Sequence, residues 1–350
     1  MDCSVKKNVT ISDIAAHANV SKSTVSRVLN DTTPVNEEKR KAVLAAMQEM
    51  NFEPNIFARG LASGQSYTVG VVTQNLGSPF YDSIAQGVVT GLADTAYSAI
   101  FADGQWQPEI GQAVVKTLIG RMVDGLILIG NRLPPDDLEE LKQTIPTLVV
   151  GAHIDGWEKL CMYVDNEQAA YEATQHLIEL GHTKIAHITG IPSHQDAILR
   201  LNGYRRALTE ANIEVDEDLI CEGNFHGESG LAGVETLLKH GKPFSAIFAA
   251  NDSTAFGARL ALYRRGILVP EDVSIVGFDD QTEAEFSTPP LTTIRQPAEE
   301  IGIAAAETIL KLINKQDYKI QNIKATLMKR ESTCPPNLSL IHISEPTRPY

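Results

Sequence analysis

The stretch VTISDIAAHANVSKSTVSRVL, residues 9–29, predicts two short helices joined by a tight corner. Thr10 can cap the first helix with its hydroxyl, and Asp13 follows three residues later, at the positive end of the helix dipole. Asn19 suits the corner because asparagine tolerates a left-handed backbone. Ser21 can cap the second helix. Apolar residues at helical spacing in both segments predict that the two helices pack against each other.

This arrangement is typical of a helix-turn-helix, in which the first turns of the second helix enter the major groove of DNA. The second helix would direct four polar side chains outward: Lys22, Ser23, Ser26 and Arg27. Arginine is suited to guanine, lysine to guanine or phosphate, and serine to a base edge or the backbone. The alternative is a small helical hairpin with solvated polar side chains. The flanking sequence favours DNA binding.

Composition limits the class of protein. The chain has 350 residues, 43% of them hydrophobic, which is enough for two or three domains with large cores. No apolar run approaches the roughly 20 residues of a membrane span and the N-terminus lacks the apolar segment of a secretory signal, so we expect a cytoplasmic protein without a membrane partner. Residues 1–66 carry eight Lys and Arg against seven Asp and Glu, and the remainder carries 22 against 37. The net charge of −14 therefore arises outside the N-terminal segment, and any DNA contact is expected to be local.

The sequence lacks patterns typical of metal sites or enzymes. The cysteines are widely separated, which predicts free thiols: Cys3, Cys161, Cys221 and Cys334. The three closest histidines have spacings that do not converge on one face: His176, His182 and His187. Neither a nucleophile elbow nor a phosphate-binding loop follows a predicted strand. We therefore expect no metal, no cofactor and no enzymatic activity.

A third helix is expected after the helix-turn-helix. Asn36 can cap it, and one side carries Val43, Leu44 and Met47. The segment NIFARGLASGQS, residues 55–66, then predicts a further short helix. A helix of this length is unstable without a partner.

Residues 9–66 resemble the DNA-binding headpiece of the lactose repressor (LacI) family of bacterial transcription regulators. The resemblance rests on TISDIAAHANVSKSTVSRVLN, then PN, then ARGLASG, in the order and spacing of the family. It implies a hinge helix that folds on the operator, with Leu61 wedged into the minor groove. Together with the motif it predicts these DNA-binding residues: Thr10, Ser21, Lys22, Ser23, Thr24, Ser26, Arg27, Asn30, Asn36, Asn55, Ala58 and Leu61.

From Tyr67 onward, apolar runs alternate with amphipathic helical segments. Seven runs with Gly, Asn or Asp at their C-terminal ends predict strands: YTVGVVTQ, AIFADG, VDGLILIG, TLVVG, KIAHITG, AIFAAND and VSIVGFDD. Continuous apolar runs are buried on both faces, which indicates parallel sheets covered by helices. A break near residues 163–166 divides the strands between two sheets. Ligands bind outside the carboxyl ends of such strands, so we expect a site in a cleft between two lobes.

The resemblance to the LacI family continues to about Thr333, through SPFY, GHTKIAHITG, RLNGYRRAL, AAND, EDVSIVGFDD and PPLTTIRQP. The fold expected is an all-α helix-turn-helix headpiece followed by an α/β two-lobed core, similar to periplasmic binding proteins, with parallel sheets. The expected boundaries are 1–50 for the headpiece, 51–66 for the hinge helix and linker, 67–333 for the effector-binding core, about 67–166 and 297–325 for its first lobe, and about 167–296 and 326–333 for its second. The tail SLIHISEPTRPY, residues 339–350, has no place in this fold and is expected to be non-native.

Three polar residues are candidates for effector binding in the second lobe. Arg200 lies on a helix with apolar neighbours and could simply be solvated, but the matching arginine of the family bonds the effector, and a planar guanidinium suits sugar hydroxyls or a carboxylate. Asn251 and Asp279 each follow a predicted buried strand. Their alternative role is to cap the next helix, which Asp252 and Asp280 could serve instead. An amide and a carboxylate at a cleft edge can bond vicinal hydroxyls.

Aromatic and first-lobe candidates complete the predicted site. Phe80 and Phe225 stand where the family commonly places an aromatic against the ligand, although aromatics more often belong to a core. Gln74, Asp103 and Trp106 lie on strand-end loops of the first lobe and are weaker candidates.

The function predicted is that of a dimeric repressor of a carbohydrate-utilisation operon, which binds a palindromic operator in double-stranded DNA. The effector is expected to be a sugar or sugar phosphate, with a nucleoside or another metabolite as the alternative. Ala298 stands where the family sometimes has an aromatic, which leaves the ligand size open. A transport receptor with the same core would need a secretory signal, and an enzyme would need a nucleophile, a metal or a phosphate loop. The sequence leaves open whether the effector releases the protein from DNA or recruits it.

Overall fold

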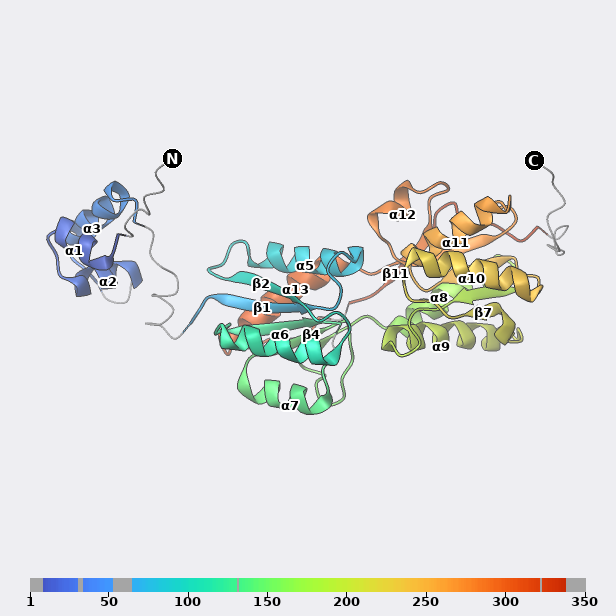
Figure 1. The fold of residues 1–350 in the computed structure, drawn as a ribbon, viewed down its shortest axis with the longest axis horizontal. Helices are drawn as coiled ribbons and strands as arrows, with labels where there is room; N and C mark the ends of the chain where they lie inside the picture. Colours follow the sequence, from blue (N-terminus) through green and yellow to red (C-terminus); the bar gives the residue numbers. More distant parts are fainter. Residues whose placement is uncertain (1–8, 31–33, 53–64, 131, 322, 338–350) are drawn as a thin grey trace. The chain divides into compact units, whose positions relative to one another are not determined.

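The computed structural model describes residues 9–30, 34–52, 65–130, 132–321 and 323–337. The chain divides into two compact units, one of residues 1–68 with 118–124, and one of residues 69–117 with 125–350 (Figure 1). Within the described ranges, no helix combines the length and the apolar character that crossing a membrane requires.

The described residues before position 53 form three helices: α1 (Ile11–His17), α2 (Lys22–Asn30) and α3 (Glu37–Glu49). The start of α1 is the one that the sequence predicts, since Thr10 Oγ1 accepts from the backbone N–H of Asp13 and the Asp13 carboxylate accepts from that of Thr10. Asn19 has a φ of 51° at the corner before α2. The buried residues of the three helices form a small shared core: Ile14, Ala15, Val25, Val28, Val43 and Ala46.

One side of α3 differs from the expectation. Val43 is fully buried, whereas Leu44 is 50% exposed. Successive residues of a helix are about 100° apart, so the buried side continues from Val43 to Ala46 and Met47. The prediction that Leu44 faces the core is therefore wrong.

The first lobe is built on a five-stranded sheet in the order β2-β1-β3-β4-β5. Its strands are β1 (Thr68–Thr73), β2 (Ser98–Asp103), β3 (Gly125–Ile129), β4 (Thr147–Val150) and β5 (Cys161–Met162). The pairs β1-β3, β3-β4 and β4-β5 are parallel. The helices of this lobe are α5 (Pro79–Leu92), α6 (Pro108–Gly120), α7 (Pro135–Thr144) and α13 (Ala298–Ile313).

Helices α5 and α13 approach each other closely because glycines face the contact. A Cβ atom on Gly87 would lie 2.1 Å from the carbonyl oxygen of Glu299, and one on Gly302 would lie 2.1 Å from that of Ile84. A side chain at either position would force the helices apart. The late segment α13 is thus fixed to the early segment α5 through backbone contact.

The second lobe is built on a six-stranded sheet in the order β11-β10-β9-β8-β6-β7. Its strands are β6 (Ile185–Ile188), β7 (Ile220–Cys221), β8 (Ala246–Ala249), β9 (Ser274–Asp279), β10 (Thr292–Arg295) and β11 (Thr326–Met328). All are parallel except β11, which pairs antiparallel with β10. Its helices are α8 (Asn166–Glu179), α9 (Gln195–Glu210), α10 (Gly227–His240), α11 (Asp252–Arg264) and α12 (Thr282–Phe286), with a 3-10 turn at Glu217–Leu219. Because α13 comes between β10 and β11 in the sequence, the chain passes between the lobes three times.

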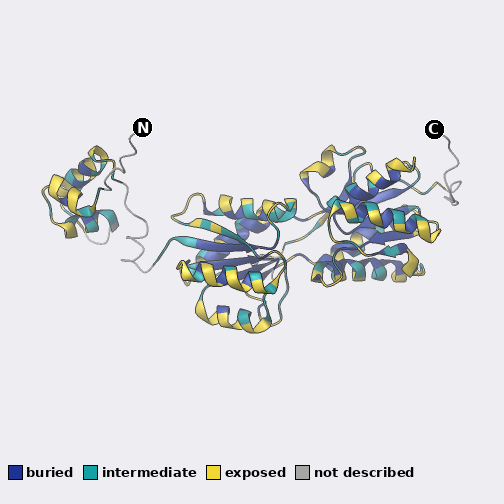
Figure 2. Ribbon diagram, viewed as in Figure 1, coloured by how far each residue is buried: buried dark blue, intermediate teal, exposed yellow. Residues whose placement is uncertain are grey.

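Burial on both faces explains the continuous apolar runs. In β8, Ile247 and Ala249 point into the core formed with α10 and α11, whereas Ala246 and Phe248 point into the core formed with α8 and α9. Alternate side chains of a strand point to opposite faces, so both sets must be apolar. Figure 2 shows buried strands in both sheets and helices exposed on their outer sides. The sequence does not predict β5 and β7, because runs of two residues are too short to carry a pattern.

Candidate functional site

A cavity of about 250 Å³ lies at the carboxyl ends of strands from both lobes. Five of the seven predicted effector-binding residues line it: Phe80, Arg200, Phe225, Asn251 and Asp279. Trp106, the weaker candidate, lines it as well. Gln74 and Asp103 are not among the lining residues.

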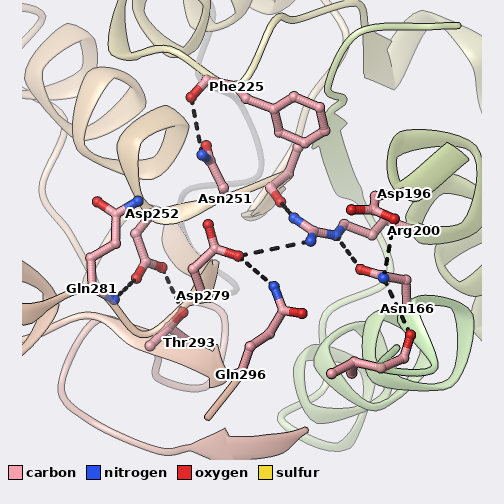
Figure 3. Close-up of polar contacts among 12 residues, drawn as sticks. Asn166, Asp196, Arg200, Phe225, Asn251, Asp252, Asp279, Gln281, Thr293 and Gln296 are labelled. Atoms are coloured by element: carbon pink, nitrogen blue, oxygen red, sulfur yellow. Dashed lines mark hydrogen bonds and ion pairs between the residues drawn. The ribbon is translucent and has the colours of Figure 1, made fainter. Parts of the chain in front are cut away.

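Arg200, on α9, is held in a fixed orientation at this cavity (Figure 3). Its Nε donates to Asn166 Oδ1 at 2.8 Å, and its Nη1 donates to the carbonyl oxygen of Ala250 at 2.6 Å. The guanidinium carbon lies 3.7 Å from the centre of the Phe278 ring, a cation–π contact. The side chain is almost completely buried, so the alternative of a merely solvated arginine is wrong. The remaining nitrogen, Nη2, is directed toward Asp279.

Asp279 ends β9 and carries the second charge of the cavity. Its Oδ1 accepts a hydrogen bond from Gln296 Nε2 at 2.8 Å and lies 3.8 Å from Arg200 Nη2. Its φ of 106° is rare for a residue with a side chain, which is typical of strained functional positions. Burial raises the pKa of Asp279 to about 6, although Arg200 and the hydrogen bond from Gln296 act in the opposite direction.

Asn251 lines the cavity and also stabilises the start of α11. Its Oδ1 accepts from the backbone N–H of Thr254 at 3.0 Å and from its hydroxyl at 2.8 Å, so Asn251 itself caps α11. Its Nδ2 donates to the carbonyl oxygen of Phe225 at 3.0 Å. The expectation that Asp252 caps the helix in its place is wrong, because the buried Asp252 carboxylate accepts from the backbone of Gln281 and the hydroxyl of Thr293.

Asp280 does not cap a helix either. Its Oδ2 lies 2.6 Å from Arg295 Nε and its Oδ1 lies 2.7 Å from Arg330 Nη1. The cap position of α12 belongs to Gln281, whose side chain makes no capping hydrogen bond. Both alternative caps proposed from the sequence are therefore committed to tertiary contacts.

Ring side chains form a connected wall along the cavity. Tyr81 contacts Phe80 and Trp106 with ring centres 5.4 and 5.6 Å apart, respectively. His194 contacts Trp106 at 4.6 Å and Phe225 at 5.4 Å, so the wall continues from the first lobe into the second. The Phe225 ring lies over Gly190, which follows the end of β6. The backbone of Phe225 is in the left-handed region, with a φ of 68°.

Tyr81, His194 and Asp196 line the cavity but are not predicted from the sequence. His194 occupies the cap position of α9, where its Nδ1 accepts from the backbone N–H of Asp196 at 3.1 Å. Burial lowers the pKa of His194 and raises that of Tyr81 well above its ordinary value. The signal available in the sequence was the position of His194 and Asp196 at the start of the helix that carries Arg200, since helix starts converge on this cavity.

Gln74 and Asp103 were predicted to contact the effector, but both lie outside the cavity lining. Asp103 Oδ1 accepts from the backbone N–H of Gln105 at 2.9 Å, and its Oδ2 accepts from that of Leu76 at 3.2 Å. Asp103 thereby joins the loops that follow β1 and β2, close to Trp106. Gln74 is 4% exposed and lies against Gly104. Asp103 is therefore bonded to backbone groups, whereas Gln74 Oε1 is buried without a hydrogen-bond partner among the described residues. Neither lines the cavity, and their role as ligands stays a prediction.

Helix α2 of the N-terminal unit exposes Lys22, Ser23 and Arg27, three of the side chains predicted to read DNA. Ser26 and Thr24 are half-buried on the same helix. Two long cations and a hydroxyl on one exposed helix can donate hydrogen bonds to base edges and phosphates.

The other predicted DNA-binding residues differ in what the structure describes. Ser21 caps α2 by accepting from the backbone N–H of Thr24 at 3.2 Å, and Asn36 caps α3 by accepting from that of Glu38 at 2.8 Å. Thr10 caps α1, as described above. The side chain of Asn30 and the residues Asn55, Ala58 and Leu61 lie outside the described part of the chain.

Comparisons relate the chain to known proteins. A family model described as bacterial regulatory proteins, lacI family, matches residues 10–55, and one described as a periplasmic binding protein-like domain matches residues 174–333. Catabolite control protein A of Priestia megaterium is 34% identical over 330 residues, which cover 93% of this chain and 99% of that protein. The ribose operon repressor of Escherichia coli K12 is 35% identical over 329 residues, covering 92% and 99%. The crystal structure of the lac repressor dimer bound to operator and the anti-inducer ONPF matches with a TM-score of 0.86 and 31% identity, covering 94% of this chain and all of that one.

Proposed function

Because the chain belongs to the LacI family of bacterial regulatory proteins, we propose that it represses a carbohydrate-utilisation operon under the control of a small sugar effector. The chain is a DNA-binding transcriptional regulator with a helix-turn-helix and a two-lobed effector-binding core. In this proposal it acts in the bacterial cytoplasm, binds a palindromic operator as a homodimer and has no catalytic activity. The carbohydrate assignment is supported by the names of two relatives, the ribose operon repressor and the lac repressor.

The observation that carries the effector assignment is the pair Arg200 and Asp279 in a cavity with aromatic walls. A sugar presents hydroxyls around its rim and C–H groups on its faces. Asp279 can accept from a hydroxyl, and Arg200 Nη2 can donate to one. The rings of Phe225 and Trp106 can cover the faces. The lining combines these rings with further polar side chains, among them Asn75, Asp196 and Asn224, which can bond hydroxyls around the rim of a sugar.

The proposed mechanism is a population shift. Arg200 and Asp279 belong to the second lobe, whereas Phe80, Tyr81 and Trp106 belong to the first. A ligand that bonds residues of both lobes favours one relative orientation of the lobes over the others. If DNA affinity depends on that orientation, ligand and operator binding are coupled reciprocally.

A second candidate effector is a nucleoside, because the cavity is lined by several ring side chains. Trp106, Tyr81, His194 and Phe225 offer flat surfaces on which a base could stack. The polar pair would then bond the ribose hydroxyls or the base edge. This alternative leaves the repressor mechanism unchanged and differs only in the ligand.

Two measurements test the proposal. Selection from random DNA by the full-length protein should yield a near-palindromic site, and recovery of an asymmetric single site would contradict dimeric operator binding. Fluorescence anisotropy of that labelled site should then change on addition of a sugar from a panel of pentoses, hexoses and disaccharides. A response to adenosine or cytidine, with none to any sugar, would replace the sugar by the nucleoside alternative.

A further inference from the structure

One carboxylate holds the segment that leads into the core. Residues 65–67, which we call the entry segment, directly precede Thr68, the first residue of β1. Asp124 Oδ1 accepts hydrogen bonds from the backbone N–H of Ser66 at 2.8 Å and from the Ser66 hydroxyl at 3.1 Å. Asp124 Oδ2 accepts from the backbone N–H of Tyr67 at 2.8 Å. Both oxygens of the carboxylate are therefore bonded to the entry segment.

Asp124 itself is fixed by the residues around it. Its backbone N–H donates to the carbonyl oxygen of Thr68 at 2.8 Å. The next residue, Gly125, pairs with Val69 in the parallel ladder between β3 and β1. Val123, which precedes Asp124, is only 6% exposed. The position of the carboxylate is therefore set by the sheet and by a buried neighbour.

The backbone of the entry segment is strained at Tyr67, whose φ of 53° lies in the left-handed region that residues with side chains rarely adopt. Such a conformation persists where surrounding contacts hold it, and it is found most often at functional sites. The bond to Asp124 is one of the contacts that hold Tyr67. Residues 118–124 also belong to the same compact unit as residues 1–68. The entry segment therefore has a defined conformation to which Asp124 contributes.

We infer that Asp124 is a positioning residue for operator recognition, because its carboxylate fixes the direction in which the chain leaves β1 toward the N-terminal helices. The inference rests on the proposed binding of a palindromic operator by a homodimer. The two half-sites of a palindrome lie at a fixed spacing, so both copies of α2 must reach their base pairs at once. An entry segment held in one conformation restricts where each copy can reach. Asp124 thereby contributes to the selection of one half-site spacing.

The bonds to Asp124 should also raise the affinity for the operator. Ordering the backbone of each residue costs conformational entropy. Because the entry segment is ordered when the protein folds, that cost does not arise again when the protein binds its operator. Binding to random DNA depends mainly on phosphate charge and does not require both copies of α2 to be in register. The effect should therefore be confined to specific binding.

DNA binding by the full-length protein tests the inference. The probes are the operator that the wild type selects from random DNA, versions of it with one or two base pairs inserted at the centre, and a random duplex of the same length. In fluorescence anisotropy, Asp124→Ala should raise the Kd for the operator at least tenfold and that for the random duplex less than twofold. The spacing penalty, which is the Kd for an inserted version divided by that for the operator, should fall at least threefold.

Two further variants make the test specific to the carboxylate. Asp124→Asn keeps one oxygen for Ser66 but has an amide N–H₂ group in place of the acceptor for Tyr67, so its effects should be intermediate. Asp272→Ala is the matched control for the loss of charge. It removes a carboxylate that accepts from the backbone N–H of Leu268 at 2.8 Å in the second lobe, and it should change none of the Kd values.

Urea unfolding separates positioning from a general loss of structure. Asp124→Ala should unfold cooperatively, and if it does not, Asp124→Asn decides by the same criteria. An equal rise in Kd for all probes would mean that Asp124 acts only through the stability of the fold, which would overturn the inference. A wild-type operator Kd with a wild-type spacing penalty would overturn it as well, and the proposed function would stand. If the wild type selects no sequence from random DNA, the proposed function itself is wrong.

Discussion

Arg200 Nη2 and Asp279 Oδ1 lie 3.8 Å apart, close enough for strong attraction between the charges but too far for a hydrogen bond. Both groups are nevertheless held in place, Arg200 by Asn166 and Ala250 and Asp279 by Gln296. The guanidinium donor and the carboxylate acceptor are therefore held in place without bonding each other. Both remain able to form hydrogen bonds with a ligand. A ligand hydroxyl can donate to the carboxylate while another accepts from the guanidinium.

Arg200→Ala and Asp279→Ala should each abolish the response of operator binding to the effector and leave operator affinity nearly unchanged. The loss of a charged hydrogen bond, with its buried partner left unsatisfied, costs about 2–4 kcal/mol, or a ~30- to 1,000-fold weaker Kd. Arg206→Ala, on the same helix but outside the cavity, is the matched control. If the effector normally releases the protein from DNA, either variant should repress permanently. If the effector is a corepressor that DNA binding requires, either variant should fail to repress. A normal response from either variant would refute the site.

The stability of the protein should depend on pH through Asp279. Its pKa is raised from 3.8 to about 6 in the folded protein, so the folded state holds the proton more tightly than the unfolded state. The resulting stabilisation is fully present below about pH 3.8 and is lost as the pH rises through about 6. It amounts to at most about 3 kcal/mol. Buried histidines and Asp252 also have shifted pKa values, so the contribution of Asp279 is measured as a difference between two proteins. In urea unfolding between pH 4.5 and 7.5, the free energy of unfolding of the wild type minus that of Asp279→Asn should decline as the pH rises, and parallel curves would disprove it.

Lys22→Ala and Arg27→Ala should weaken operator binding and relax the base preference at the positions they contact. Each good bidentate base contact is worth about 1–3 kcal/mol. Lys39→Ala, which removes an exposed cation from α3, is the control for the loss of charge alone. Selection from random DNA measures the preference. A consensus identical to that of the wild type would mean that α2 does not read bases.

Gly190→Ala should impair effector binding without any direct contact to the effector. A Cβ atom at this position would lie 2.0 Å from Phe225 Cζ, so the ring must move away from the strand end and toward the cavity. We expect a Kd for the effector at least tenfold higher, together with a cooperative unfolding transition. Gly120→Ala, where the added Cβ has open space, should change neither property. Unchanged effector affinity in Gly190→Ala would show that the ring position does not matter.

Local signals predicted the helix starts and the long strands. Thr10, Ser21 and Asn36 cap helices because the cap depends on one side chain and the backbone within three residues of it. The site was harder, because side chains from distant elements compete for the same partners. Asn251 caps α11 while Asp252 bonds Gln281 and Thr293, and nothing in the letters AAND distinguishes these roles. Asp103 likewise has the sequence position of a ligand, whereas in the structure its carboxylate accepts hydrogen bonds from backbone N–H groups of two loops.

The contact between α5 and α13 has a consequence for biosynthesis. About 200 residues separate the end of α5 from the start of α13, so a ribosome needs about 10–40 s to supply the partner. During that interval Ile84 and Val88 lack the part of their core that α13 supplies, such as Ile301 and Ala305. A nascent chain that exposes apolar side chains of α5 in this way is a substrate for chaperones and a starting point for aggregation. We therefore expect the yield of this protein in cells to follow translation speed and chaperone supply more closely than the stability of its final fold.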